Sequence, residues 1–390
     1  MRCKQDLNKT DIDPAEVERI RSTACEIAPA LRMLYSNEGS ATVSFYPDGE
    51  VFDTLKSDHD PGKPIVVKPL MIEPDADTAA EFSAYKSARN QSPEVVIVRG
   101  VGGFKISESK KHEATHRRLA GKISVVTGGA QGFGKGIAES LAAEGALIAV
   151  ADLNLDGALE CAAELNRIYG AETAIAVQVD VSDDASVKNM IRETVLSFGG
   201  LDIMISNAGI LIAGSLSDLS KEQFELVTKV NYTGYFLCAK YACEPMKIQN
   251  RFAPGYMTDI IEINSKSGLE GSNKNSAYAG SKFGGIGLTQ SFAMELVEYG
   301  IKVNAVCPGN LLDGPLWSDP VKGLFKQYLD SGKVEGAKTV DDVRKFYEAK
   351  VPMGRGCTIP DVIRAILYII EQKYETGQAI AVTGGQVMLK

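Results

Sequence analysis

The stretch KISVVTGGAQGFGKGIAESLAAEGALIAVADLN, residues 122–154, decides the fold. It contains an apolar strand, a glycine-rich turn, an amphipathic helix and a second apolar strand. Further apolar, β-branched runs follow towards the carboxyl terminus, and helical stretches separate most of them. Near-continuous apolar strands that alternate with helices predict a parallel sheet covered on both faces. We therefore expect an α/β fold built on a doubly wound parallel sheet.

The glycine-rich turn suits a dinucleotide, as in a Rossmann-type sheet. Gly128, Gly132 and Gly134 let the backbone approach a pyrophosphate, and the following helix points its free N–H groups at the phosphates. Asp152 ends the second strand, where its carboxylate can accept hydrogen bonds from the adenosine ribose. A tight turn with a helix-capping aspartate would explain the same residues without a ligand. Asp180, at the end of the third strand, fits an adenine contact and an ordinary N-cap equally well.

Further motifs occur in order along about 270 residues. They are a glycine motif, an N-A-G turn, an asparagine in a helix, a serine placed 13 residues before a Y-x-x-x-K pair, and a Pro-Gly pair after a later strand. In this sequence the motif residues are Thr127, Gly128, Gly132, Gly134, Asn207-Ala208-Gly209, Asn231, Ser265, Tyr278, Lys282 and Pro308-Gly309. On these motifs, the chain from about residue 121 onwards resembles the short-chain dehydrogenase/reductase family.

The resemblance implies a full set of site residues. The catalytic residues would be Asn231, Ser265, Tyr278 and Lys282, and no metal would take part. The cofactor-binding residues would be Thr127, Gly128, Gly132, Phe133, Gly134, Asp152, Asp180, Val181, Asn207, Ala208, Gly209, Tyr278, Lys282, Pro308 and Gly309.

The chemistry explains why these residue types are needed. Hydride transfer between an alcohol and a nicotinamide requires a general acid/base within hydrogen-bond reach of the same oxygen. A free tyrosine, with a pKa near 10, is too weak a base near neutrality. Lys282 follows Tyr278 by one helical turn, so its ammonium can favour the phenolate. Ser265 would hold the substrate oxygen, and the resemblance implies that Asn231 positions a water beside Lys282. An exposed tyrosine–lysine pair and a strand-end serine are the structural alternative.

The cofactor expected from the sequence is NAD. The segment ADLN around Asp152 has no arginine or lysine to neutralise the 2′-phosphate of NADP, although Lys135 lies just past Gly134. The segment after Pro308-Gly309, NLLDGPLW, lacks the threonine with which many family members contact the nicotinamide carboxamide. That contact is therefore not expected here.

The substrate expectation also rests on resemblance. The segments NSKSG, VPMGRGC and TGGQVMLK are most similar to family members that oxidise sorbitol 6-phosphate to fructose 6-phosphate with NAD. Lys266 and Lys274 could then bind the substrate phosphate as point charges, or they could be solvated loop lysines. The alternatives are a dehydrogenase of an unphosphorylated polyol or small hydroxyaldehyde, and an idle NAD-binding redox sensor.

A change in the sequence pattern near residue 119 divides the chain into two parts. We expect a dehydrogenase domain over 119–390, with a lid-like insertion at 310–352 that carries two helical stretches and equal numbers of basic and acidic residues. Residues 1–118 form a smaller mixed α/β extension that leads out through a charged helix containing His112 and His116. Its end is weakly similar to the tail of a class II aldolase domain. With only His59, His112 and His116 it lacks a zinc cluster, so we expect a non-catalytic role.

Composition excludes several classes of protein. With 42 basic and 50 acidic residues the net charge is −8, which argues against nucleic-acid binding. No apolar run of membrane-spanning length and no secretory signal occur, and the seven cysteines are odd in number and scattered. We expect a cytoplasmic protein with reduced thiols and a small-molecule substrate. The family resemblance implies that the protein is a homodimer or homotetramer.

Overall fold

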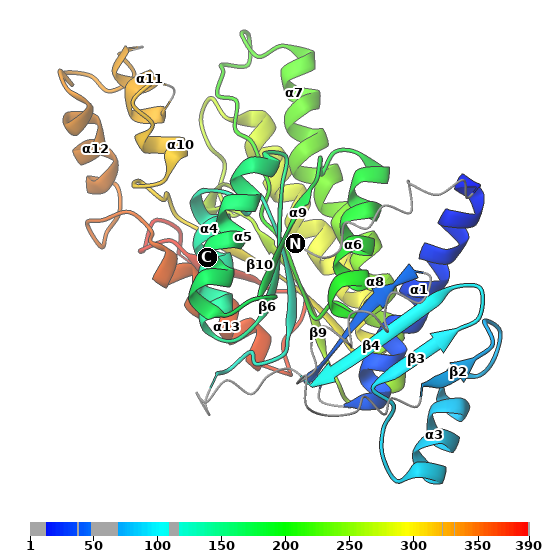
Figure 1. Ribbon diagram of the computed structural model, residues 1–390. Coiled ribbons are helices and arrows are strands. Elements are labelled where there is room, and N and C mark those ends of the chain that lie inside the picture. Colours follow the sequence, from blue (N-terminus) through cyan, green and yellow to red (C-terminus); the bar gives the residue numbers. More distant parts are fainter. Residues whose placement is uncertain are drawn as a thin grey trace.

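The computed structural model describes residues 13–36, 39–47, 69–108, 117–321, 323–330 and 332–388. Its larger sheet has seven parallel strands in the order β11-β10-β9-β8-β5-β6-β7 (Figure 1). The strands are β5 (Ile123–Thr127), β6 (Leu147–Asp152), β7 (Ala174–Gln178), β8 (Ile203–Ser206), β9 (Thr258–Ile263), β10 (Ile301–Pro308) and β11 (Ala379–Val382). The expected doubly wound parallel sheet is confirmed.

Helices cover both faces of this sheet because each buries one apolar side. One core cluster packs α4 (Gly132–Ala143), α5 (Leu155–Tyr169) and α13 (Ile359–Glu371) on the first face. The second face carries α6 (Asp184–Phe198), α8 (Gly234–Phe252) and α9 (Ser276–Leu296). Shorter helical segments precede or follow these helices: α7 (Lys221–Thr228), the π-helix η3 (Lys229–Thr233), and the 3₁₀ turns η4 (Lys266–Gly268) and η5 (Val297–Tyr299).

The strand order reverses between β5 and β8. Loops that leave neighbouring parallel strands in opposite directions open a crevice at the carboxyl ends of those strands. The glycine-rich turn follows β5 and the N-A-G turn follows β8. The predicted cofactor motifs therefore meet at the topological switch point.

The amino-terminal part forms the smaller mixed sheet, in the order β1-β4-β3-β2. Its strands are β1 (Ala41–Tyr46), β2 (Leu70–Ile72), β3 (Val95–Val98) and β4 (Gly102–Glu108), and its helices are α1 (Pro14–Tyr35) and α3 (Thr78–Arg89). The expected mixed α/β character of this segment is confirmed. The charged connector with His112 and His116 lies outside the described residues, as does His59.

Helix α1 packs beside α6 and α8, and one hydrophobic cluster runs through the amino-terminal part and the large sheet (Figure 1). The fully buried Arg32 of α1 lies at the centre of this contact. Its Nη2 atom donates to Oδ2 of Asp202 at 2.7 Å and also to the carbonyls of Gly39 and Gly121. The Tyr256 hydroxyl donates to Oδ1 of Asp202 at 2.6 Å. The two parts are thus joined by a buried charge pair.

The segment after β10 carries α10 (Pro315–Ser318), α11 (Leu324–Asp330) and α12 (Val340–Ala349), which stand beside the main body (Figure 1). Both helical stretches expected in the insertion are present. Trp317 packs edge-on against Tyr347 at 4.8 Å between ring centroids, and Phe325 and Tyr328 complete the cluster. The insertion therefore has its own aromatic core.

Within the described ranges, no helix has the length and apolar character needed to cross a membrane. The six cysteines in the same ranges are free thiols. Burial raises the pKa of Cys238 and of Cys307 to about 12, so these thiols are core residues and not nucleophiles.

Candidate active site

The glycine turn after β5 disfavours any other residue at three positions, one because of a close contact and two because of the backbone conformation. A Cβ on Gly134 would lie 1.9 Å from the carbonyl oxygen of Gly128. Gly128 and Gly132 have φ values of +63° and +56°, in the left-handed region. Phe133, in the first turn of α4, packs against the hydrophobic core that this helix covers. The resulting bare backbone leads into α4, whose N-cap residue Gln131 makes no side-chain capping bond. This arrangement fits a pyrophosphate.

Thr127 and Asn207 join the two loops at the switch point. The buried Thr127 hydroxyl accepts from the backbone N–H groups of Asn207 and Ala208 at 3.0 and 3.1 Å. Asn207 Nδ2 donates to the carbonyls of Thr127 and Gly128. These hydrogen bonds therefore hold the glycine turn against the loop after β8. Gly209 follows, and a Cβ there would lie 3.2 Å from Oδ1 of Asn231.

The two aspartates at neighbouring strand ends behave differently. The Asp152 carboxylate accepts from the N–H groups of Ala130 and Asn154 at 3.0 and 2.9 Å, so it faces the glycine turn. Asp180 accepts from Ser182 N–H at 2.8 Å, and hydrogen bonds to Ser182 lower its pKa. The N-cap of α6 is Asp183. The N-cap interpretation of Asp180 was therefore wrong, because the helix begins later than the strand-end pattern indicates.

Asn231 lies in a helix distortion, and Val181 packs against the start of the helix that follows it. Val181 is buried against Gly234, where an added Cβ would lie 3.1 Å from its side chain. Asn231 occupies the π-helix η3, a form that is rare and is frequent at functional sites. Its Oδ1 accepts from Ile210 N–H at 2.8 Å. Its Nδ2 donates to the carbonyl of Ile210 at 2.9 Å and to Ser281 Oγ at 3.2 Å. Asn231 therefore links the loop after β8 to α9.

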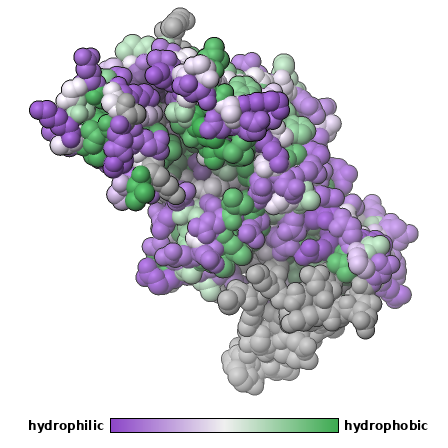
Figure 2. All heavy atoms as spheres, turned by 90° about the horizontal axis from the view of Figure 1, so that it is seen from above, coloured by the Kyte–Doolittle hydropathy of each residue, from purple (hydrophilic) through white to green (hydrophobic). Residues whose placement is uncertain are grey.

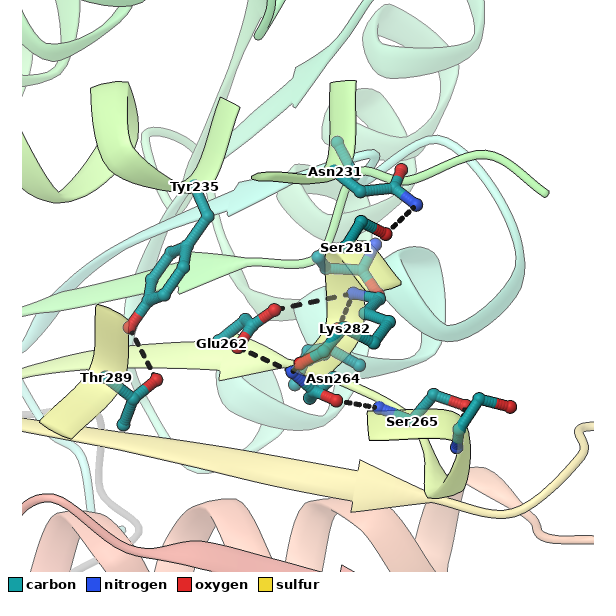
Figure 3. A network of polar contacts seen from close by, with 12 residues as sticks. Asn231, Tyr235, Glu262, Asn264, Ser265, Ser281, Lys282 and Thr289 are labelled. Carbon is teal, nitrogen blue, oxygen red and sulfur yellow. Dashed lines mark hydrogen bonds and ion pairs between the residues drawn. The ribbon is translucent and has the colours of Figure 1, made fainter. Parts of the chain in front are cut away.

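Lys282 lies in a buried polar network at the end of β9 (Figure 3). Its Nζ donates to the carbonyl of Ile263 at 2.8 Å and lies 3.6 Å from Oε1 of Glu262. Asn264 Nδ2 donates to Oε2 of Glu262 at 2.8 Å and to the carbonyl of Lys282 at 2.9 Å. Asn264 Oδ1 accepts from Ser265 N–H at 2.8 Å. One network thus holds the backbone of Ser265 and the ammonium of Lys282.

Glu262 and Asn264 are site residues that sequence reasoning missed. The available signal was a carboxylate inside the apolar run DIIEIN. Burial raises the pKa of Glu262, and Lys282 partly opposes that effect. Oε1 of Glu262 accepts no hydrogen bond from any described residue. The carboxylate consequently acts on Lys282 through charge more than through a hydrogen bond.

Tyr278 and Ser265 lie on the two elements that flank this network. Tyr278 is half-buried in the first turn of α9, and its carbonyl accepts from Ser281 Oγ at 2.8 Å. Ser265 caps η4, where its hydroxyl accepts from Ser267 N–H at 3.1 Å. The structure therefore brings Asn231, Ser265, Tyr278 and Lys282 together on η3, η4 and α9.

The remaining predicted residues surround the same region. Pro308 ends β10, and Gly309 N–H donates to the carbonyl of Val382 at 2.9 Å. Lys266 begins η4, and Lys274 lies in the loop before α9. Lys135 forms ion pairs with Glu164 at 3.2 Å and Glu139 at 3.6 Å, so its charge is already matched.

The insertion lies next to both loops of the site. Pro315 is the nearest side chain to a Cβ built on Gly132, and Leu211 packs against the aromatic core of the insertion. Figure 2 shows the face that carries the insertion and α7, with hydrophobic side chains gathered towards its middle between hydrophilic margins. The site is therefore bordered by the insertion on one side.

Three comparisons with known proteins agree with this geometry. The family model described as short chain dehydrogenase matches residues 122–318. The sorbitol-6-phosphate 2-dehydrogenase of Escherichia coli is 40% identical over 269 residues, which cover 68% of this chain and 99% of that enzyme. A sorbitol dehydrogenase of Cereibacter sphaeroides is 31% identical and is 99% covered, against 70% of this chain. The crystal structure of the sorbitol-6-phosphate 2-dehydrogenase SrlD from Erwinia amylovora is 41% identical and has a TM-score of 0.63, covering 68% of this chain and 100% of that one.

Proposed function

The chain belongs to the short-chain dehydrogenase family, and on this premise we propose that it is an NAD-dependent oxidoreductase interconverting a polyol phosphate and a ketose phosphate. The proposed pair is sorbitol 6-phosphate and fructose 6-phosphate. The observation that carries the proposal is the grouping of Ser265, Tyr278 and Lys282 where β9 ends and α9 begins. The 40% identity to a sorbitol-6-phosphate 2-dehydrogenase supports this choice of substrate.

The residues at the switch point fit a dinucleotide. The turn has no room for a Cβ at Gly134 and a left-handed backbone at Gly128, and it leads into the amino terminus of α4. The carboxylate of Asp152 at the end of β6 suits ribose hydroxyls and repels a 2′-phosphate. Lys135 is paired with two glutamates, so its charge does not favour NADP. When bound, NAD would accept the hydride from the substrate carbon.

The side chains would then divide the proton chemistry. Ser265 donates a hydrogen bond to the substrate oxygen and holds it towards Tyr278. Tyr278 removes the hydroxyl proton during oxidation and returns it during reduction. Lys282 favours the phenolate by its positive charge, and Glu262 fixes that charge in position. Asn231 holds the loop after β8 against α9.

A steady-state assay of NAD reduction over sugar alcohols and their 6-phosphates tests this function. We expect sorbitol 6-phosphate to give the highest kcat/KM, and sorbitol to be at least about tenfold poorer because it lacks a charge-assisted contact. Equal use of free sorbitol or of a small hydroxyaldehyde would place the chain with general polyol dehydrogenases. Binding of NAD without turnover of any alcohol would indicate an idle, cofactor-bound protein.

A further inference from the structure

Two lysines of the insertion share one aromatic support. The Nζ atom of Lys333, between α11 and α12, lies 3.7 Å from the ring centroid of Tyr328. The Nζ atom of Lys350, at the end of α12, lies 4.1 Å from the ring centroid of Phe346 and 5.1 Å from that of Tyr347. The two tyrosine rings stack with centroids 5.5 Å apart. The stacked pair therefore holds both ammonium groups in one part of the insertion.

Two other lysines lie in the loops around the proposed catalytic residues. Lys266 is half-buried directly after Ser265. Lys274 has a φ of +58°, a conformation that a non-glycine residue keeps only when its surroundings hold it. Its carbonyl accepts from Gly214 N–H at 2.9 Å, which supplies part of that support. The backbone position of Lys274 is thus fixed from the loop after β8.

The two pairs of lysines act on each other electrostatically. Burial lowers the pKa of Lys333, and the charges of Lys274 and Lys350 lower it further. Burial also lowers the pKa of Lys266, where Glu270 raises it and Lys350 lowers it. The structure joins the two places: Leu211, in the loop after β8, packs against the aromatic cluster that contains Tyr328, and Gly214 of the same loop bonds to the carbonyl of Lys274. The insertion and the catalytic loops therefore gather positive charge in one place.

The described acidic side chains do not form ion pairs with these four lysines. Other insertion lysines are paired: Lys326 lies 2.5 Å from Asp330, and Lys345 lies 2.6 Å from Asp341. In the part of the chain that the structure describes, no carboxylate forms an ion pair with any of the four gathered lysines, which are Lys266, Lys274, Lys333 and Lys350. The insertion is neutral in composition, but Lys333 and Lys350 have no ion-pair partner among the described residues. Glu270 opposes this charge at Lys266, and the remaining excess of positive charge favours a bound anion.

We propose that Lys333 and Lys350 bind the phosphate group of the substrate together with Lys266 and Lys274, as a site built between the insertion and the catalytic loops. The ligand class is a dianionic phosphate monoester of a polyol or ketose. This inference rests on the proposed function, and it assigns the insertion a role in substrate specificity.

The 2′-phosphate of NADP is a second possible source of the same chemistry. That group would lie at the end of β6 near Asp152, where the ribose is expected. Within the lysine cluster, Lys266 instead adjoins Ser265, and Lys274 lies in the loop before Tyr278, which is the substrate side. The substrate phosphate is therefore the anion that this position serves.

The test compares sorbitol 6-phosphate with sorbitol as substrates of the full chain. The variants are Lys333→Met, Lys350→Met and the double variant, since methionine keeps an apolar side chain of similar length. Matched controls are Lys326→Met and Lys345→Met, which remove paired lysines of the same insertion. We expect each cluster variant to lower kcat/KM for sorbitol 6-phosphate by about tenfold to a hundredfold. Sorbitol kinetics and both controls should stay unchanged.

The outcomes separate the two proposals. An unchanged ratio of the two kcat/KM values in the double variant would overturn the lysine site while leaving the proposed function intact. Failure of the unaltered protein to oxidise either compound would overturn the proposed function. In that case, calorimetric titration with sorbitol 6-phosphate decides the lysine site: binding lost in the double variant but kept in the controls supports it, and equal or absent binding in all of them refutes it.

Discussion

The carboxylate of Glu262 lies 3.6 Å from the ammonium of Lys282, and both side chains are almost fully buried. Asn264 bonds to both residues, which ties this pair to the backbone of Ser265 (Figure 3). A charge this close to the proposed catalytic lysine influences the proton equilibrium of the whole site, because burial weakens solvent screening.

Glu262→Gln should shift the pH dependence of alcohol oxidation. The substitution removes a negative charge that opposes formation of the Tyr278 phenolate. The acid limb of the kcat/KM profile should therefore move to lower pH by about 0.5–1 unit. Glu270→Gln, at an exposed position near Lys266, is the matched control and should leave the midpoint unchanged. An unmoved midpoint in Glu262→Gln would mean that this carboxyl group is uncharged in the working range.

Tyr278→Phe should reduce turnover by about a hundredfold to ten-thousandfold, the effect of losing a general acid/base. The ring remains, so NAD affinity measured by fluorescence titration should be nearly unchanged. Tyr374→Phe serves as the control, because Tyr374 is 99% exposed. If Tyr278→Phe kept more than about a tenth of the activity, another group would have to be the base.

Asp152→Ala should narrow the preference for NAD over NADP. The carboxylate favours ribose hydroxyls and repels a 2′-phosphate, so its removal should lower kcat/KM with NAD and raise kcat/KM with NADP. Lys135→Met should not alter the ratio, because two glutamates already pair with that lysine. Better kinetics with NADP in the unaltered protein would contradict the cofactor assignment.

Arg32→Met should destabilise the whole protein. It leaves Asp202 buried without its partner, which costs about 3–5 kcal/mol in the free energy of unfolding. Denaturant titration measures this loss. Arg19→Met, which removes an exposed pair with Glu16, should cost at most about 1 kcal/mol. A small effect of Arg32→Met would show that the amino-terminal part contributes little to the core.

The same pair predicts a pH dependence. Burial by itself would raise the pKa of Asp202, but Arg32 and Lys122 hold it below its ordinary value. A lowered carboxyl pKa contributes stability above the unfolded-state value, near 4, and that contribution is lost as the pH falls through the folded-state value. The stability difference between the unaltered protein and Arg32→Met should therefore shrink on acidification below about pH 4.

Much of the dehydrogenase fold was predictable from local patterns. The apolar, β-branched runs from residue 122 onwards became the strands of the seven-stranded sheet, because fully buried parallel strands require continuous apolar sequence. The glycine turn was also recognisable, since positive φ values and close backbone contacts exclude other residues. Helix boundaries were harder to predict from the sequence. The N-cap of α6 is Asp183, whereas the strand-end pattern also allowed Asp180.

The sequence by itself determined the order of strands and helices and the type of chemistry, because these depend on periodicity and on residue types at short spacing. Tertiary structure alone decided which charges meet. Glu262 and Lys282 are 20 positions apart in the sequence, Arg32 and Asp202 are 170 apart, and Lys333 lies far from Lys274 along the chain. No local pattern encodes such pairs, because folding brings them together by packing apolar surfaces that do not involve the charges themselves.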